Sequence, residues 1–248
     1  MTFGYLGCEF VEFTLNHHTT RLCAVAIVLR SEMTTKKTKP QASTVIIMVR
    51  HGKTPSTGKL LPGRAAGLHL SDVGQNEAIE VAKRLSKLKK VSAIYSSPLE
   101  RARETAAPIG KILDKKIVIN KGLLECDFGK WTGKGLSKLM KLPEWSTVQR
   151  APSTFRFPNG ESFTEMQSRM VSTLDDLRKA HPGGIVICVS HADPIKAAVA
   201  HAMGTHLDLF QRIVISTCSV SAVSYSAHGP VVLTVNSTGG DLADLQIS

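Results

Sequence analysis

Two patterns of apolar and polar positions alternate along the chain, one typical of buried strands and the other of amphipathic helices. Residues 44–50, TVIIMVR, form an unbroken apolar run, which is typical of a strand buried on both faces of a sheet. Further strand segments lie at 91–97, 116–120 and 185–190. The β-rich region 213–236 surrounds a turn at His228 and Gly229, which predicts a hairpin.

Helical spacing of apolar residues fills the segments between the strands. Helices are expected at 70–88, 98–113, 161–181 and 193–203. Ser71 or Asp72 is a suitable N-cap for the first helix, and Pro108 is expected to kink the second. The side chains expected to face the core from the first helix are those of Val73, Ala78, Val81, Ala82, Leu85 and Leu88.

This alternation predicts the α/β fold class with a mainly parallel central sheet. One domain is expected over residues 44–238, with an N-terminal extension at 1–43 and a flexible tail at 239–248. Residues 121–160 are rich in Gly, Lys, Trp and Pro, and we expect them to form an irregular excursion. Loops of this length are usually functional or disordered.

The N-terminal extension differs in pattern from the rest of the chain. Its apolar stretch, residues 22–29, is far too short to span a membrane, and its flanks are poor for a signal peptide. We interpret residues 1–32 as an upstream extension and Met33 as a natural start, with a cleaved leader as the alternative.

Composition narrows the functional class. Of 248 residues, 42% are hydrophobic and 21% charged, which is typical of a soluble globular protein, and only 5% are aromatic, which argues against base stacking on nucleic acid. The formal net charge of +11 is spread along the chain. Its densest cluster is interpreted as a solvated helix end and comprises Lys83, Arg84, Lys87, Lys89 and Lys90. We expect neither a nucleic-acid partner nor a membrane.

The five cysteines show no CxxC spacing. An odd number without paired spacings fits neither a disulfide framework nor a zinc site. Cys188 lies within an apolar run and is expected to be a small buried residue. The cysteines therefore indicate a reducing compartment, and the cytoplasm is the expected location.

Polar residues collect where the predicted strands end. Two histidines, two arginines and one carboxylate stand there: Arg50 and His51 after the first strand, Arg101 after the second, Glu125 after the third and His191 after residues 185–190. Because ligands of open α/β sheets bind beyond the carboxyl ends of the strands, these five side chains are expected to converge.

The set suits phosphoryl transfer. Two arginines present planar forks that match phosphate oxygens, and a neutral histidine can attack phosphorus through a ring nitrogen. A second histidine, if protonated, adds a donor to the equatorial oxygens, while a carboxylic acid can protonate the leaving oxygen and then activate water. Gly52 would let backbone approach the anion. No metal is expected, because the protein supplies the cations.

Each residue taken singly has a commoner explanation. A histidine at a strand end is more often a hydrogen-bonded structural residue, and an arginine before a helix is usually a surface charge. Metal binding by His51 and His191 is a further alternative, although a cation site would not place guanidinium groups beside it. Asp127 shares a segment with Glu125 and is the alternative acid. The coincidence of all five residues favours catalysis.

Four segments resemble the histidine phosphatase superfamily, the phosphoglycerate-mutase-like proteins. VRHGKT is similar to the phosphohistidine signature, YSSPLERARETA to the stretch S-S-P-L-x-R-x-x-x-T-A, LLECDFGKWTG to the acidic segment and VSHADPIKA to the second-histidine segment. They occur in the family's order within residues 44–238. The resemblance implies a branch 1 phosphatase without a cofactor, folded as a three-layer α/β/α sandwich with a mainly parallel central sheet.

The resemblance also implies roles for individual residues. His51 would be the nucleophile and Glu125 the acid and base. The phosphate clamp would consist of Arg50, Arg101 and His191. Thr57 is counted with the phosphate-binding residues, although the family often has asparagine there. Thr132 and Ala192 also depart from the family pattern, since they replace the glutamate of W-E-G and the glycine of S-H-G. Late segments look like a bacterial branch of the family.

Three functions are compared. A phosphatase must admit water to its phosphorylated intermediate, whereas a mutase must exclude it. The mutases carry a long basic insertion after the acidic segment, and the excursion here is short. We therefore predict a metal-independent phosphomonoester hydrolase acting on a small phosphorylated metabolite, with a phosphoglycerate-mutase-type phosphotransferase as the alternative. A catalytically silent binding protein is a third reading, against which the complete set of site residues argues.

The substrate is left open among sugar phosphates, phosphoglycerate derivatives, nucleotides and cofactor-precursor phosphates, as is the oligomeric state. The pocket walls are expected from residues 53–68 and 128–160. Five aromatic side chains there form either an apolar wall for a bulky leaving group or a small core: Phe128, Trp131, Trp145, Phe155 and Phe157.

Overall fold

A computed structural model of the chain describes residues 14–15, 18–19 and 43–242. The chain divides into two compact units, residues 1–39 and 40–248. In the first unit, the strands β1 (Thr14–Leu15) and β2 (His18–Thr19) pair in antiparallel fashion. The start proposed at Met33, and most of the extension predicted at 1–43, lie outside the described residues. None of the described helices has both the length and the hydrophobicity needed to cross a membrane.

The described part of the second unit contains a six-stranded sheet with the order β5-β4-β6-β3-β7-β8. Its strands are β3 (Thr44–Arg50), β4 (Val91–Ser96), β5 (Ile117–Ile119), β6 (Ile185–Ser190), β7 (Val220–Ser226) and β8 (Gly229–Ser237). The first four strands of that order pair in parallel, and β7 and β8 add an antiparallel hairpin. The predicted mainly parallel sheet is therefore confirmed.

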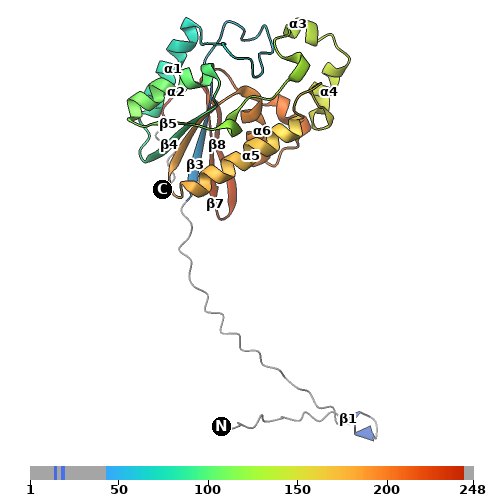
Figure 1. The fold of residues 1–248 in the computed structure, drawn as a ribbon. Coiled ribbons are helices and arrows are strands. Elements are labelled where there is room, and N and C mark those ends of the chain that lie inside the picture. Colours follow the sequence, from blue (N-terminus) through green and yellow to red (C-terminus); the bar gives the residue numbers. More distant parts are fainter. Residues whose placement is uncertain (1–13, 16–17, 20–42, 243–248) are drawn as a thin grey trace, which may run out of the picture. The chain divides into compact units, whose positions relative to one another are not determined.

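Helices cover both faces of this sheet (Figure 1). Their bounds are α1 (Asp72–Leu85), α2 (Glu100–Leu113), α5 (Phe163–Ala180) and α6 (Ala192–Ala202). Alternate residues of β3 pack into opposite layers, Ile47 against α1 and α2 and Ile46 against α5 and α6. The three-layer α/β/α arrangement is thus confirmed, and β3 is apolar throughout because both of its faces are buried.

The first helix begins at the predicted cap, since the Ser71 hydroxyl accepts a hydrogen bond from the Gly74 N–H at 3.2 Å. Most of the side chains predicted to face the core are buried, but Val73 is 54% exposed and that prediction is wrong. Five residues place Val73 about 140° around the helix from Ala78. The second helix continues through Pro108 without interruption.

The excursion 121–160 is less irregular than predicted. It contains the short helices η1 (Lys121–Leu123), η2 (Gly129–Trp131), α3 (Leu136–Leu139), α4 (Glu144–Arg150) and η3 (Pro152–Thr154). Beneath them lies a buried cluster that includes Phe128, Trp131, Phe155 and Phe157 and continues to Phe210 in η4 (Leu207–Arg212). Most of the aromatic residues of the excursion therefore form a core of their own.

The C-terminal segment after β8 lies against α1. The Arg84 guanidinium donates hydrogen bonds to the carbonyl oxygens of Ser237, Gly239 and Gly240, and Leu242 is buried in the layer of α1 and α2. The sequence predicts a solvated helix end here, and for Arg84 that prediction is wrong because the guanidinium binds this segment.

Candidate active site

Strand pairing brings the predicted site segments together. Arg50 is the register partner of Ser190 across β3 and β6. The His51 N–H donates to the Ser190 carbonyl, and the Ser97 N–H donates to the Val189 carbonyl, both at 2.9 Å. The residues that follow β3, β4 and β6 therefore lie side by side at the carboxyl edge of the sheet.

A hollow of about 360 Å³ opens at this edge and is lined by Arg50, His51, Thr57 and Glu125, among others. Arg101 and His191 are fully buried and adjoin His51. The Arg101 Nε lies 3.3 Å from the His51 Nε2, and the two histidine rings have centroids 5.2 Å apart. All six residues predicted for the site are thus brought together.

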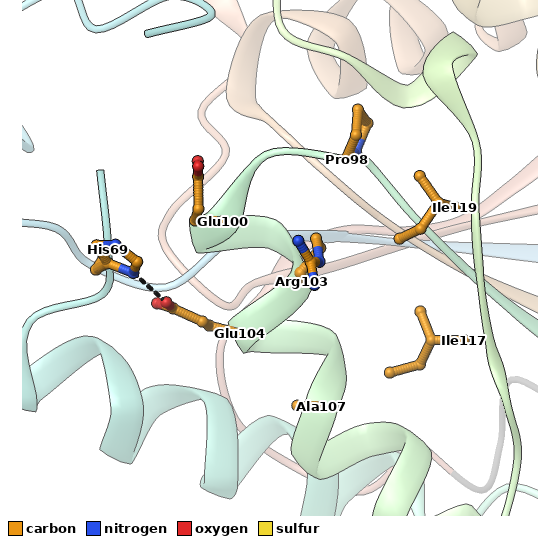
Figure 2. A pocket seen from close by; sticks show the side chains of 8 residues that line it. All are labelled: His69, Pro98, Glu100, Arg103, Glu104, Ala107, Ile117 and Ile119. Carbon is orange, nitrogen blue, oxygen red and sulfur yellow. Dashed lines mark hydrogen bonds and ion pairs between the residues drawn. The ribbon is translucent and has the colours of Figure 1, made fainter. Parts of the chain in front are cut away.

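A larger hollow of about 620 Å³ lies beside α2 and β5 (Figure 2). Its lining consists of His69, Pro98, Glu100, Arg103, Glu104, Ala107, Ile117 and Ile119. None of the six predicted residues belongs to it. His69 and Glu104 form an ion pair, and Glu100 accepts a hydrogen bond from the Gly67 N–H. We therefore place the candidate active site in the smaller hollow, where the buried titratable groups converge.

His51 has the ionisation state that a nucleophile requires. Burial, followed by the charges of Arg101 and Arg50, lowers the pKa of His51 well below its ordinary value, so the ring is neutral at pH 7. Its Nδ1 lies 2.8 Å from the Gly52 carbonyl oxygen. Because a carbonyl only accepts, Nδ1 carries the proton and the lone pair stands on Nε2.

Three donors around His51 have no hydrogen-bond partner among the described residues, although all three are buried: Arg50 Nε, Arg101 Nη1 and His191 Nδ1. A buried donor without a partner costs about 1–3 kcal/mol, so their coincidence indicates a site for an acceptor-rich ligand. One other nitrogen of each arginine is anchored on a backbone carbonyl at 2.7 Å, Arg50 Nη1 on Ile215 and Arg101 Nη2 on Gly63.

His191 can donate to a ligand without being charged. The Ser97 hydroxyl lies 2.8 Å from His191 Nε2 and accepts the Leu99 N–H at 3.4 Å. Among the described residues, Nε2 is the acceptor that the hydroxyl hydrogen reaches, so the hydroxyl donates to Nε2 and the ring proton stands on Nδ1. Burial lowers the pKa of His191 well below its ordinary value, so the protonated form considered from the sequence is not the form at neutral pH.

Glu125 is buried beside the same hollow. Burial, and then the charge of Asp193, raise the pKa of Glu125 to about 7, against the opposing effects of Arg101, the Cys126 N–H and Arg50. A carboxyl group with this pKa can both give and take a proton near neutral pH. The alternative acid, Asp127, is 42% exposed at its side chain, faces Arg64 at 3.7 Å and does not line the hollow.

Two arginines that the sequence did not single out hold the Glu125 backbone. Arg64 Nε donates to the Glu125 carbonyl at 2.8 Å, and Arg169 Nη1 donates to the Gly122 and Leu124 carbonyls at 2.7 and 3.0 Å. Both guanidinium groups also bind the Glu161 carboxylate. Arg169 lies three residues after the buried Met166, and a charged residue one turn from a buried position of α5 is the signal that could have revealed it.

The loop after His51 is shaped by close backbone contacts. A Cβ at Gly52 would lie 2.6 Å from the Gly74 carbonyl oxygen, so the close approach of α1 requires glycine at this position. The sequence predicts a different reason for this glycine, the approach of backbone to an anion. The Gly52 N–H donates to the Thr105 hydroxyl at 2.9 Å. The Thr57 hydroxyl accepts the Thr54 N–H at 2.9 Å and so holds the turn that borders the hollow.

Comparison with known proteins bears on this arrangement. The family model of the histidine phosphatase superfamily (branch 1) matches residues 46–238. The chain belongs to this superfamily. Phosphoserine phosphatase 1 of Hydrogenobacter thermophilus is 30% identical over 198 residues, which cover 78% of this chain and 92% of that protein. Other relatives of the chain carry the name "probable phosphoglycerate mutase".

Two further relatives define the extent of the similarity. A bifunctional protein of Mycobacterium tuberculosis is 28% identical over 198 residues, which make up 79% of this chain. The matched part covers about half (54%) of the length of that relative. The phosphoserine phosphatase of Entamoeba histolytica, solved in complex with phosphoserine, superposes with a TM-score of 0.72 at 26% identity over 79% of this chain and 98% of that one. The superfamily member described here thus has phosphatases and mutase-like proteins as relatives.

Proposed function

We propose that this superfamily member is a metal-independent phosphomonoester hydrolase that forms a phosphohistidine at His51 and acts on a small phosphorylated metabolite. The supporting observation is the set of three buried, unpartnered donors around the neutral His51 ring. The oxygens of a phosphate group would accept from all three donors, and guanidinium donors bind phosphate strongly.

In the first step, the phosphate oxygens accept hydrogen bonds from Arg50, Arg101 and His191. Arg101 then turns its Nε–H from the His51 Nε2 to the phosphate, which frees the lone pair of Nε2. Nε2 attacks phosphorus, the bond from phosphorus to the ester oxygen breaks, and the protonated Glu125 transfers its proton to that oxygen. The guanidinium groups stabilise the charge that builds up on the equatorial oxygens.

In the second step, the Glu125 carboxylate takes a proton from a water molecule. The water oxygen attacks phosphorus, the N–P bond breaks, and inorganic phosphate leaves with His51 again neutral. The first and second proton transfers pass through the same carboxyl group, for which a pKa of about 7 is well suited.

The test is phosphate release from a panel of phosphomonoesters in the presence of a chelator. His51→Ala is expected to lower the rate by on the order of 10³-fold or more. His69→Ala, which alters the larger hollow, is the matched control and should retain activity. Acid-labile label from a ³²P-ester should remain on the wild-type chain after quenching and be missing from His51→Ala.

Other results would contradict the proposal in different ways. An isomerised phosphoester without free phosphate would favour the mutase-type phosphotransferase. Equal release by wild type and His51→Ala would exclude His51 as the nucleophile, and ester binding without any turnover would favour a silent binding protein.

A further inference from the structure

The candidate active site continues into a second hollow. That hollow measures about 300 Å³ and lies beneath the excursion helices α3 and α4. The two hollows share Leu61, Phe128, Leu136, Asp193, Lys196 and Gln211. A group attached to a phosphate at His51 can therefore extend toward the second hollow.

The second hollow offers mainly apolar surface to such a group. Met140, Trp145 and Phe157 contribute to its walls. Met140 is 60% exposed, and Trp145, which is partly buried, stacks on Trp131 with ring centroids 6.3 Å apart. Ile213, on the side of the first hollow, extends the apolar lining toward the phosphate donors. Burial of apolar surface is the main interaction that these walls can provide.

The charges of the two hollows disfavour a second anionic group on the ligand. Among the described residues that line them, Lys196 is the one lysine or arginine besides Arg50. Its Nζ lies 3.2 Å from the Asp193 carboxylate and 3.1 Å from the Gln211 side-chain oxygen, with both members of the ion pair mostly buried. A carboxylate entering here would lose its hydration, find this cation already paired and face Asp193.

We infer, on the basis of the function proposed above, that the site selects phosphomonoesters whose leaving group is uncharged and largely apolar, an aryl or medium-length alkyl group. Esters that carry a carboxylate, such as phosphoserine and 3-phosphoglycerate, are poor substrates. The specificity of this chain therefore differs from what the name of its relative in Hydrogenobacter thermophilus indicates for that protein.

The first test compares kcat/KM for 4-methylphenyl phosphate and 4-carboxyphenyl phosphate at pH 6. The two esters have nearly the same shape, and the carboxylate makes the better leaving group, so chemistry alone favours the charged ester. We expect the methyl ester to be preferred tenfold or more. Equal rates, or a preference for the carboxylate, would overturn the inference.

Two variants test the structural cause. Asp193→Asn removes the partner of Lys196 and should lower the preference for the methyl ester at least tenfold, because the ammonium can then bind the carboxylate. Trp145→Ala should lower the ratio of kcat/KM for 4-methylphenyl phosphate to that for methyl phosphate. Met203→Ala, at an exposed position after α6, is the control and should leave both ratios unchanged.

Failure of this inference can be told apart from failure of the proposed function. Release that depends on His51 but lacks the expected preference would overturn the substrate class and leave the hydrolase in place. If no ester is hydrolysed, calorimetric binding of 4-methylphenylphosphonate and 4-carboxyphenylphosphonate measures the same preference without turnover. Tighter or equal binding of the charged phosphonate would then refute it.

Discussion

At the scale of single residues, burial drives His51 and Glu125 toward their uncharged forms. It lowers the pKa of the histidine and raises that of the carboxyl group, because each charged form loses hydration in the same hollow. A neutral imidazole and a protonated carboxyl group are the pair that nucleophilic attack with proton transfer to the leaving group requires. Burial therefore favours both the neutral His51 imidazole and the protonated Glu125 carboxyl group.

The protonated state of Glu125 predicts a pH dependence. We expect kcat/KM to fall as the pH rises through about 7, since Glu125 then loses the proton that the leaving oxygen needs. Asp193→Asn removes the second cause of the raised pKa, so the alkaline limb of the profile should move to lower pH. Asp127→Asn, outside the hollow, is the control.

Ionisation of the substrate affects the wild type and both variants equally. A difference in the pH of the alkaline limb between their profiles therefore reports a change in the pKa of a group on the enzyme. An alkaline limb that stays in place in Asp193→Asn, or moves equally in Asp127→Asn, would contradict the assignment of this limb to Glu125. The measurement is a series of initial rates at low substrate concentration from pH 5 to 9.

At the scale of elements, α5 positions the Glu125 segment through Arg169. The guanidinium donates to the Gly122 and Leu124 carbonyls from Nη1 and to Glu161 from Nε, whereas the three donors of a lysine ammonium all leave from one atom and cannot reproduce this planar fork. Arg169→Lys is expected to lower kcat by on the order of 10²-fold, as misplacement of a catalytic group by about 1 Å does. The KM should change little, since the phosphate donors lie on other segments.

Arg156→Ala is the matched control for this prediction. Arg156 also pairs with a carboxylate, that of Glu165, but on the exposed surface, where such pairs contribute little. A rise in KM with unchanged kcat in Arg169→Lys would indicate that Arg169 acts on substrate binding and not on Glu125.

The elements also show what the sequence could and could not predict. The strand ends were predictable because buried runs such as residues 45–49 stop abruptly at polar residues with known chemistry. Val73 is apolar but lies about 140° around the helix from Ala78, so its residue type alone misleads the assignment of the buried face. The short helices of 121–160 have too few turns for a periodic pattern, and the ion pair of Asp193 with Lys196 faces the hollow only through tertiary packing.

At the scale of the whole molecule, the buried histidines couple stability to pH. The unfolded chain binds protons at His51 and His191 below about pH 6.5, whereas both histidines stay neutral in the folded chain at this pH. Their contribution to stability is therefore present above pH 6.5 and is lost as the pH falls. The effect of Glu125 on stability has the opposite sign, because its raised pKa costs stability as the pH rises toward 7. The two histidines together outweigh this single carboxyl group, so stability falls overall as the pH falls.

We accordingly expect the free energy of unfolding, measured with urea, to fall between pH 6.5 and 5. The double variant His51→Gln, His191→Gln should lose much less over this range. His228→Gln, in the exposed turn between β7 and β8, serves as the control and should follow the wild type. A double variant with the wild-type slope would assign the acid sensitivity to other groups.

The strand order has a consequence for how the chain folds. β3 pairs with β6 and β7, so the residues that complete the centre of the sheet lie more than 130 positions further along the chain. Closing such long segments is slow, and sheets that depend on distant pairings fold late. During synthesis the apolar strand 45–49 must wait until residues 185–226 have left the ribosome. Until then this segment is exposed, and it can bind chaperones or associate with other unfolded chains.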